Sequence, residues 1–307
     1  MMTRIERDAL VICTRNRAQD LERCLRSVEI QSRVPTETLV VDSSDGDEAL
    51  IVVQEFADRG NIPNLRFVHT ARGLTKQRNF ALDMLSSGVD IVHFIDDDVE
   101  LAGEYVNSLL TEFEASPHLV GAGGMVLGGN REPPKRLAIW GGRESTTPGR
   151  VLPSGFNIGA HETPTAVGME WLPGCSMSFR RQRIQGLRFD EERVGYAIGE
   201  DVDFGLRASA VGELRHVPSA RLVHNQSPVN RIDRPEIMRL AVRHRWTLAA
   251  DGLGRVKRTA VVYGTLTESI HQLLSGVRHA NGTSLKCAHA VVLGLLDILR
   301  RGHTRGH

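Results

Sequence analysis

The feature that most constrains this chain is the stretch 91–100, which reads Ile-Val-His-Phe-Ile-Asp-Asp-Asp-Val-Glu. A short apolar run with β-branched residues predicts a buried strand, of the kind found in parallel sheets. At its end lie Asp96, Asp97 and Asp98. They would stand at the carboxyl edge of the sheet, which is where open α/β sheets bind ligands. The stretch therefore predicts an α/β fold with an acidic ligand site at one sheet edge.

Three adjacent carboxylates repel one another unless positive charge lies among them, and such oxygen ligands suit Mg²⁺ or Mn²⁺ better than zinc. Because side chains alternate along a strand, we expect Asp96 and Asp98 to face the metal and Asp97 to face the other way. The alternative is that the acids only cap a helix that begins near Leu101. A cap needs one acid and this strand supplies three, so we favour the metal site.

Strand and helix patterns alternate along the first hundred residues. Apolar runs typical of strands occur at 8–14, 38–42 and 65–69, and helical spacing of apolar residues occurs at 20–31, 47–59 and 74–85. This alternation predicts βαβ units and a mostly parallel central sheet flanked by helices. After a helix at 101–115, the glycine- and proline-rich segments 121–129 and 140–159 predict strands and long loops over the active edge. The later expected elements are a helix at 200–211, a strand at 215–225, and helices at 237–250, 259–274 and 285–301.

Composition places the chain among ordinary globular proteins. With 307 residues, 41% of them hydrophobic, it can bury a large core as one large domain or two closely associated ones. A net charge of +1 argues against nucleic acid as a partner. Four cysteines without CxxC spacing fit a reducing compartment and no zinc site. No apolar stretch approaches the roughly 18 residues of a membrane span, so we expect a cytoplasmic protein, free or attached to the inner face of the membrane.

Basic and acidic residues follow the other predicted strands. Thr14 and Arg15 follow the first strand, where a loop and helix start could meet a phosphate or a base, although basic loop residues are often only solvated. Asp42 ends the second strand and could accept a base N–H or a ribose hydroxyl, or start an Asx-turn. Arg78 stands near a helix start, where a cation is unfavourable without an anion such as a diphosphate or a nearby acid.

A second acidic site is predicted later in the chain. Glu200 and Asp201 lie in the first turn of a helix, where acids favour the helix dipole. One of them could instead face the cleft as a general base. His224 ends a later strand and could be a core histidine or a third metal ligand, since imidazole binds Mn²⁺ acceptably.

The order of these motifs resembles the family 2 glycosyltransferases of the GT-A fold. They are Cys-Thr-Arg-Asn-Arg at 13–17, Asp42, Arg78-Asn79, Phe-Ile-Asp-Asp-Asp-Val at 94–99, Leu-Pro-Gly-Cys-Ser-Met at 172–177 and Gly-Glu-Asp-Val-Asp-Phe-Gly-Leu-Arg at 199–207. The resemblance covers about 8–224. It implies a GT-A catalytic domain at 1–228, with a nucleotide-sugar-binding half at 1–100 and an acceptor-binding half at 101–228. A helical C-terminal extension would occupy 229–307.

The resemblance also implies inverting transfer of a sugar from a nucleotide-diphosphate sugar, with a divalent metal. Thr14, Arg15 and Asp42 would hold the base and ribose, Arg78 the donor phosphates or the acidic loop, and Asp96 and Asp97 would also contact the donor. Asp96, Asp98 and His224 would bind the metal. On the acceptor side would lie Trp171 as a sugar-stacking platform, Gly174, Cys175 and Glu200. Asp201 matches the family's catalytic base.

One departure from the motifs of the family narrows the activity that we expect. Processive members carry a Gln-x-x-Arg-Trp motif, and here Val242 stands in place of the glutamine before Arg245-Trp246. A single-sugar transferase acting on a glycan or lipid-linked acceptor therefore fits better than a polymer synthase. A non-catalytic nucleotide-sugar or carbohydrate binding module of the same fold is the alternative. An aspartate-phosphorylating phosphatase would need Asp-x-Asp-x-Thr, but Val99-Glu100 follow the acids here.

The C-terminal part from Val229 is basic, with Lys and Arg exceeding Asp and Glu by about eight. Its last predicted helix carries an apolar stripe of Val291, Val292, Leu295, Leu296 and Leu299. Such a stripe either packs on the protein's own core or lies in a membrane interface, close to a lipid-linked acceptor.

Overall fold

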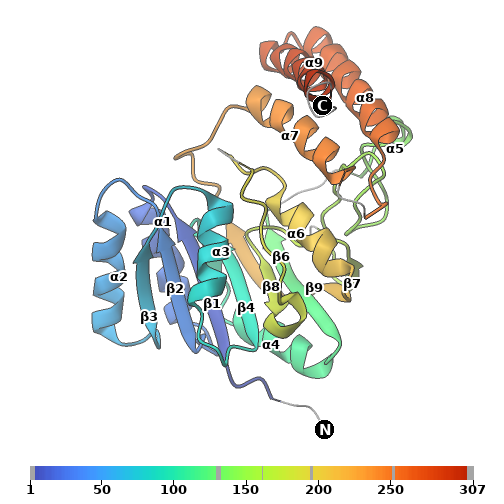
Figure 1. Ribbon diagram of the computed structural model, residues 1–307. Coiled ribbons are helices and arrows are strands. Elements are labelled where there is room, and N and C mark those ends of the chain that lie inside the picture. Colours follow the sequence, from blue (N-terminus) through green and yellow to red (C-terminus); the bar gives the residue numbers. More distant parts are fainter. Residues whose placement is uncertain (1–3, 129–132, 161, 194–195, 251–252, 303–307) are drawn as a thin grey trace. The chain divides into compact units, whose positions relative to one another are not determined.

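The computed structural model describes residues 4–128, 133–160, 162–193, 196–250 and 253–302. The chain forms two compact units (Figure 1). The sheet unit comprises Met1–Arg131 and Gly159–Arg231, and the helical unit comprises Glu132–Ile158 and Ile232–His307. The sequence predicted an extension from residue 229 and gave 132–158 to the acceptor-binding half. The structure instead groups 132–158 with the C-terminal helices.

The first half of the sheet unit alternates strands and helices as predicted. Its elements are β1 (Asp8–Thr14), α1 (Ala18–Glu29), β2 (Glu37–Asp42), α2 (Glu48–Arg59), β3 (Leu65–His69), α3 (Leu74–Met84) and β4 (Ile91–Asp96). The strands are parallel in the order β3-β2-β1-β4. In this register Thr14 pairs with Asp42, and Cys13 with Asp96, so the carboxyl ends of three strands meet at one edge.

The second half of this unit makes the sheet mixed. Its elements are β5 (Val99–Leu101), α4 (Tyr105–Ala115), β6 (Leu119–Leu127), β7 (Val167–Met169), β8 (Met177–Arg180), a 3₁₀ turn (Arg181–Ile184), α6 (Glu200–Ser209) and β9 (Glu213–His224). β8 lies antiparallel between β4 and β6, and β9 runs parallel to β6. The short strands β5 and β7 pair with β9 at its opposite ends.

Strand alternation places apolar residues on both faces of the sheet. Leu10 and Ile12 of β1 belong to the core cluster that includes residues of α1, α2 and α4. Ala9 and Val11 belong to the cluster that includes residues of α3 and α6. Near α6, Phe204 stacks on Phe189 with ring centroids 4.2 Å apart. Both faces of the sheet are therefore covered, and α6 is anchored by an aromatic contact behind its acidic start.

The helical unit contains α5 (Arg136–Trp140), α7 (Arg234–Leu248), α8 (Arg258–Arg278) and α9 (Gly282–Gly302). Val291 and Ile298 of α9 are buried with Val242 of α7. The stripe predicted on the last helix is therefore used in part inside this unit, while Val292 and Leu296 are exposed. The side chain of Leu299 lies outside the described residues. None of the helices, as far as the described residues extend, is both long and apolar enough to cross a bilayer.

Candidate active site

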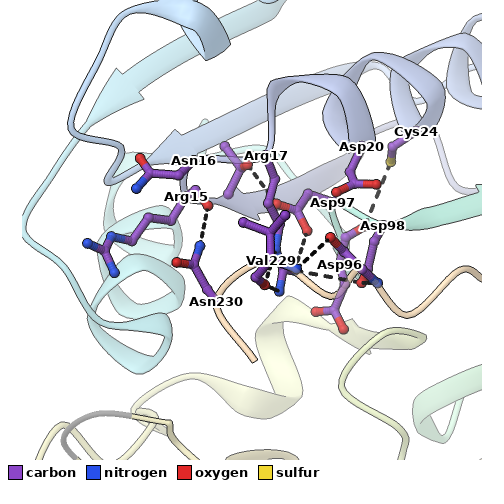
Figure 2. Close-up of polar contacts among 12 residues, drawn as sticks. Arg15, Asn16, Arg17, Asp20, Cys24, Asp96, Asp97, Asp98, Val229 and Asn230 are labelled. Carbon is purple, nitrogen blue, oxygen red and sulfur yellow. Dashed lines mark hydrogen bonds and ion pairs between the residues drawn. The ribbon is translucent and has the colours of Figure 1, made fainter. Parts of the chain in front are cut away.

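The three acids at the end of β4 do not alternate as a strand. β4 ends at Asp96, and Asp97 and Asp98 form the turn into β5. Asp97 is buried and accepts a hydrogen bond from Arg17 Nη1 at 3.0 Å (Figure 2). It also accepts one from the Thr14 hydroxyl at 2.7 Å. Burial raises the pKa of Asp97 to about 7, although Arg17 and Thr14 act to lower it. The strand ends at Asp96, so alternation along a strand does not itself set the direction of the next two acids. Asp96 and Asp98 nevertheless both lie near His224, whereas Asp97 contacts Thr14 and Arg17.

Asp98 is also buried and turns towards the end of β9. Its Oδ2 accepts a hydrogen bond from the Ser227 amide at 2.8 Å, and His224 Nε2 lies 3.0 Å from its Oδ1. Burial opposes ionisation of Asp98, but the His224 contact and the Ser227 amide outweigh it and lower the pKa. The pKa of His224 is raised, because Asp98 and Asp96 outweigh burial. The contact between Asp98 and His224 is therefore an ion pair when His224 is protonated.

Asp96 is the most exposed of the three acids and meets two other candidate ligands. A carboxylate oxygen of Asp96, a ring nitrogen of His224 and the Sγ of Cys175 all lie within 4.8 Å of one another. His224 Nε2 is 3.9 Å from Asp96 Oδ2. These side chains come from the ends of β4 and β9 and from the loop before β8. Oxygen, nitrogen and sulfur donors that converge in this way could hold a divalent ion.

Arg78 of α3 joins the two acidic groups. Its side chain is buried, and its guanidinium contacts Glu200 Oε1 at 2.8 Å, Asp96 Oδ1 at 3.3 Å and the Gly174 carbonyl at 3.0 Å. Burial and the neighbouring Asp201 raise the pKa of Glu200 to about 7, while Arg78 acts to lower it. Because all these contacts are made inside the protein, Arg78 links the end of β4 at Asp96 to the start of α6 at Glu200.

Asp201 lies next to this pair in the first turn of α6. Its Oδ2 accepts a hydrogen bond from the Gly174 amide at 2.9 Å and its Oδ1 one from the Val202 amide at 2.8 Å. Burial raises the pKa of Asp201, although these amides oppose the shift. A Cβ on Gly174 would lie 3.0 Å from Glu200 Oε1 and 3.3 Å from Arg78 Nη2. A side chain at this position would therefore require Glu200 or Arg78 to shift by a few tenths of an ångström.

On the side of β1 and β2, the predicted base-binding residues are largely engaged with the protein. Asp42 is buried, accepts the Ser44 amide at 3.0 Å in an Asx-turn, and contacts His69 Nδ1 at 3.1 Å. Arg15 Nη2 lies 3.4 Å from Asp45 Oδ2. Beside them an open pocket of about 440 Å³ is lined by the starts of α1 and α2, including Asn16 and Arg17, and by Val229. A flat ring or a ribose could enter there.

Trp171 does not present a platform to this edge. Its side chain is only 7% exposed, and its backbone packs against Gly205 of α6, where a Cβ would lie 2.7 Å from Trp171 Cα. Sugar stacking needs an open ring face, so the structure does not support that role for Trp171.

Sequence reasoning overlooked Arg17 and Gln77. Arg17 is the N-cap of α1, and besides Asp97 its guanidinium reaches the Val229 carbonyl at 2.6 Å (Figure 2). A cation at a helix start is unfavourable without an anion, which is the signal that could have found Arg17. Buried Gln77 donates to the carbonyls of Thr14 at 3.0 Å and Val41 at 2.8 Å. No short pattern marks Gln77, because its partners lie on two other strands.

Solved structures of glycosyltransferases share this fold. The mannosyltransferase PcManGT from Pyrobaculum calidifontis, solved with GDP-Man and Mn²⁺, is 17% identical, with a TM-score of 0.59 over 95% of this chain and 87% of its own. TarS 1–349 of S. aureus is 18% identical, with a TM-score of 0.55 over 88% and 74% of the two chains. GalNAc-T7, solved with UDP, GalNAc and Mn²⁺, is 18% identical, with a TM-score of 0.56 over 80% and 50%.

The architecture and the acidic sheet edge are thus those of a glycosyltransferase with the GT-A fold. The family model described as glycosyl transferase family 2 matches residues 9–180, and the chain belongs to that family. No curated protein shows significant sequence similarity to it.

Proposed function

We propose that this protein transfers a single sugar, with inversion, from a nucleotide-diphosphate sugar to a hydroxyl of a glycan or lipid-linked acceptor. The observation that carries the proposal is the Arg78 bridge. It holds Asp96 on one side and Glu200, next to Asp201, on the other. This bridge would keep the proposed metal ligand Asp96 and the proposed base Asp201 at the same sheet edge.

The donor would bind at the carboxyl ends of β1, β2 and β4. The pocket beside Asn16 and Arg17 is open and lies at the starts of two helices, where partial positive charge favours an anion, while the acids Asp20, Asp45 and Glu48 also line it. Thr14 and Arg17 fix Asp97 at the same edge. Two of the similar structures were solved in complex with GDP-Man and with UDP, which supports a nucleotide donor here.

A divalent ion, Mn²⁺ or Mg²⁺, fits the residues present. Asp96 and His224 would hold it, with the Cys175 sulfur beside them, and Asp98 would orient His224. The presence of Mn²⁺ in two of the similar structures supports this assignment. When bound, such an ion supplies positive charge that stabilises a departing diphosphate. Burial raises the pKa of the Cys175 thiol, so Cys175 would stand beside the ion as a neutral thiol and the ligands would be oxygen and nitrogen atoms.

Asp201 would act as the general base. As the acceptor oxygen forms its bond to the anomeric carbon, its proton passes to the Asp201 carboxylate, and the bond from that carbon to the diphosphate oxygen breaks. A single displacement inverts the configuration and needs no protein nucleophile. Burial raises the pKa of Asp201, which makes the carboxylate a better proton acceptor than a solvated one. Glu200 is occupied by Arg78 and would orient the loop.

The proposal is tested with a panel of UDP-, dTDP- and GDP-sugars, by donor hydrolysis with Mn²⁺ and by donor binding in calorimetry. Asp201→Asn should bind the active donor but lose turnover, and Asp96→Ala should lose metal-dependent binding. Asp83→Asn, an exposed acid of the same unit, is the matched control and should behave like wild type. Tight donor binding without any turnover in the wild-type protein would instead identify a binding module. Full turnover in Asp201→Asn would exclude Asp201 as the base.

A further inference from the structure

Helix α8 exposes most of its large apolar residues to solvent and buries polar ones. The residues that it buries include Thr265, Glu268 and Gln272, and Glu268 is held by Arg143 at 2.7 Å. The residues that it exposes form one apolar stripe at helical spacing, which we name the α8 face: Tyr263, Leu266, Ile270, Leu273, Leu274 and Val277. Ile270 is 56% exposed and Val277 71%. This inversion indicates that the outward side meets something other than water.

The α8 face is extended by the short helix α5 of the same unit. Tyr263 donates a hydrogen bond from its hydroxyl to the Trp140 carbonyl at 3.2 Å. Trp140 is 80% exposed, and Leu137 on the same short helix is also open to solvent. Tryptophan is the side chain most enriched at the boundary between lipid and water. The exposed apolar surface thus ends in an aromatic residue suited to that boundary.

The exposed charges of the segment that contains α8 and α9 have one sign. Within the described residues 257–300 the acids are Glu268 and Asp297, and both are paired inside the unit, Asp297 with Arg239 at 2.7 Å. The cations of the same range are exposed: Lys257, Arg258, Arg278, Lys286 and Arg300. Two copies that met through this face would bring these cations together. An anionic lipid surface would be complementary to them.

We propose that the α8 face binds the interface of an anionic membrane, with its apolar residues among the acyl chains and the surrounding cations at the headgroups. An apolar stripe beside Lys and Arg is the pattern of helices that lie in the membrane plane. The inference does not depend on sugar transfer, because all its residues lie in the helical unit. It assigns the contact mainly to α8, not to the predicted stripe on α9, part of which is buried.

The test is co-sedimentation of the full chain with vesicles of phosphatidylcholine alone or mixed with phosphatidylglycerol. Wild type should bind the mixed vesicles at low salt and much less at high salt. The triple variant Ile270→Ser, Leu274→Ser and Val277→Ser should lower the partition coefficient by roughly ten-fold or more. The matched control is Ile30→Ser with Ile51→Ser, two exposed isoleucines of the sheet unit, which should bind like wild type.

Two further readouts keep the result interpretable. Circular dichroism should be the same for all variants, because exposed side chains are replaced. Trp140 fluorescence should shift to the blue on binding, and Trp140→Phe should remove the shift. Absence of binding by folded wild type at low salt, or equal binding by the triple variant, would overturn the proposal. Oligomers in ultracentrifugation that the triple variant dissociates, without vesicle binding, would show that a second copy covers the face instead.

Discussion

The buried ion pair between Arg78 and Glu200 gives the sharpest prediction. Arg78→Met keeps an unbranched apolar stem but leaves Glu200 without its 2.8 Å partner. Removing one partner of a buried pair typically costs about 3–5 kcal/mol, because the other charge stays uncompensated. Asp96, the second partner, is partly exposed and can regain water, so most of the cost should come from Glu200. We expect the free energy of unfolding to fall by about 3–5 kcal/mol at pH 8.

A double-mutant cycle isolates the pair. Glu200→Gln alone should cost about 1–3 kcal/mol, since Arg78 keeps Asp96 and the Gly174 carbonyl. Arg78→Met combined with Glu200→Gln should cost less than the sum of the single variants by about 1–3 kcal/mol. Urea unfolding followed by hydrogen exchange in peptides of the sheet unit measures this unit alone.

The pH dependence of Arg78→Met follows from Glu200. The pKa of Glu200 in the folded protein is about 7, above its ordinary value of 4.5, and loss of Arg78 raises it further. A carboxyl with a raised folded pKa destabilises the fold increasingly as pH rises from its unfolded pKa through its folded pKa. The cost of Arg78→Met should therefore be smaller at pH 5 than at pH 8. The reasoning would be refuted if the double variant cost the sum of the two single variants within about 0.5 kcal/mol, or if the cost of Arg78→Met did not change with pH.

Three further predictions concern packing, thiols and pH. Gly124→Ala should lower the free energy of unfolding in urea by about 1–3 kcal/mol or more, because its Cβ would lie 2.4 Å from a carbonyl oxygen of β9. A Cβ at Gly168 has open space, so Gly168→Ala should be near neutral, and equal costs for the two variants would contradict this packing. Burial raises the pKa of Cys13 to about 12 and that of Cys24 well above its usual range. A thiol reagent at pH 8 should therefore label both cysteines only as fast as the protein unfolds, as measured by mass spectrometry, and rapid labelling of the folded protein would disprove this. Burial lowers the pKa of His216, so the stability of the wild type should fall as pH drops below 6.5, and the difference from His216→Gln should change with pH in that range and become constant near pH 8. A pH-independent difference would argue against the shift.

The strands and helices of the first half were predictable because each carries its own periodicity. β1, β3 and the start of β4 have the predicted bounds, and α3 differs by one residue. The three-residue strands β5 and β7 were missed, since pairing with β9 rather than local pattern defines them. Proximity of β1, β2 and β4 at the acidic edge followed from topology. The partners of each acid did not, because they depend on residues such as Arg17 and Ser227 far along the chain.

The sequence also did not predict that residues 132–158 belong to the same unit as the C-terminal helices. This grouping depends on contacts such as Arg143 with Glu268, which are 125 residues apart, and on Arg245, which lies 3.6 Å from the Phe156 ring. The orientation of α8 was equally hidden. Its apolar spacing predicts a helix, but only the burial of Glu268 and Gln272 shows that the apolar side faces outward.

The helical unit is built from two separate stretches of the chain, which are synthesised at different times. Residues 132–158 leave the ribosome about 100 residues before Arg258, the first residue of α8. At the usual elongation rate of 5–20 residues per second, Arg143 is synthesised roughly 6–25 s before Glu268, so this segment waits in the nascent chain without its partner. A gene shortened after Arg231 would leave it in that condition permanently, and removing the tail would therefore not yield a clean catalytic core.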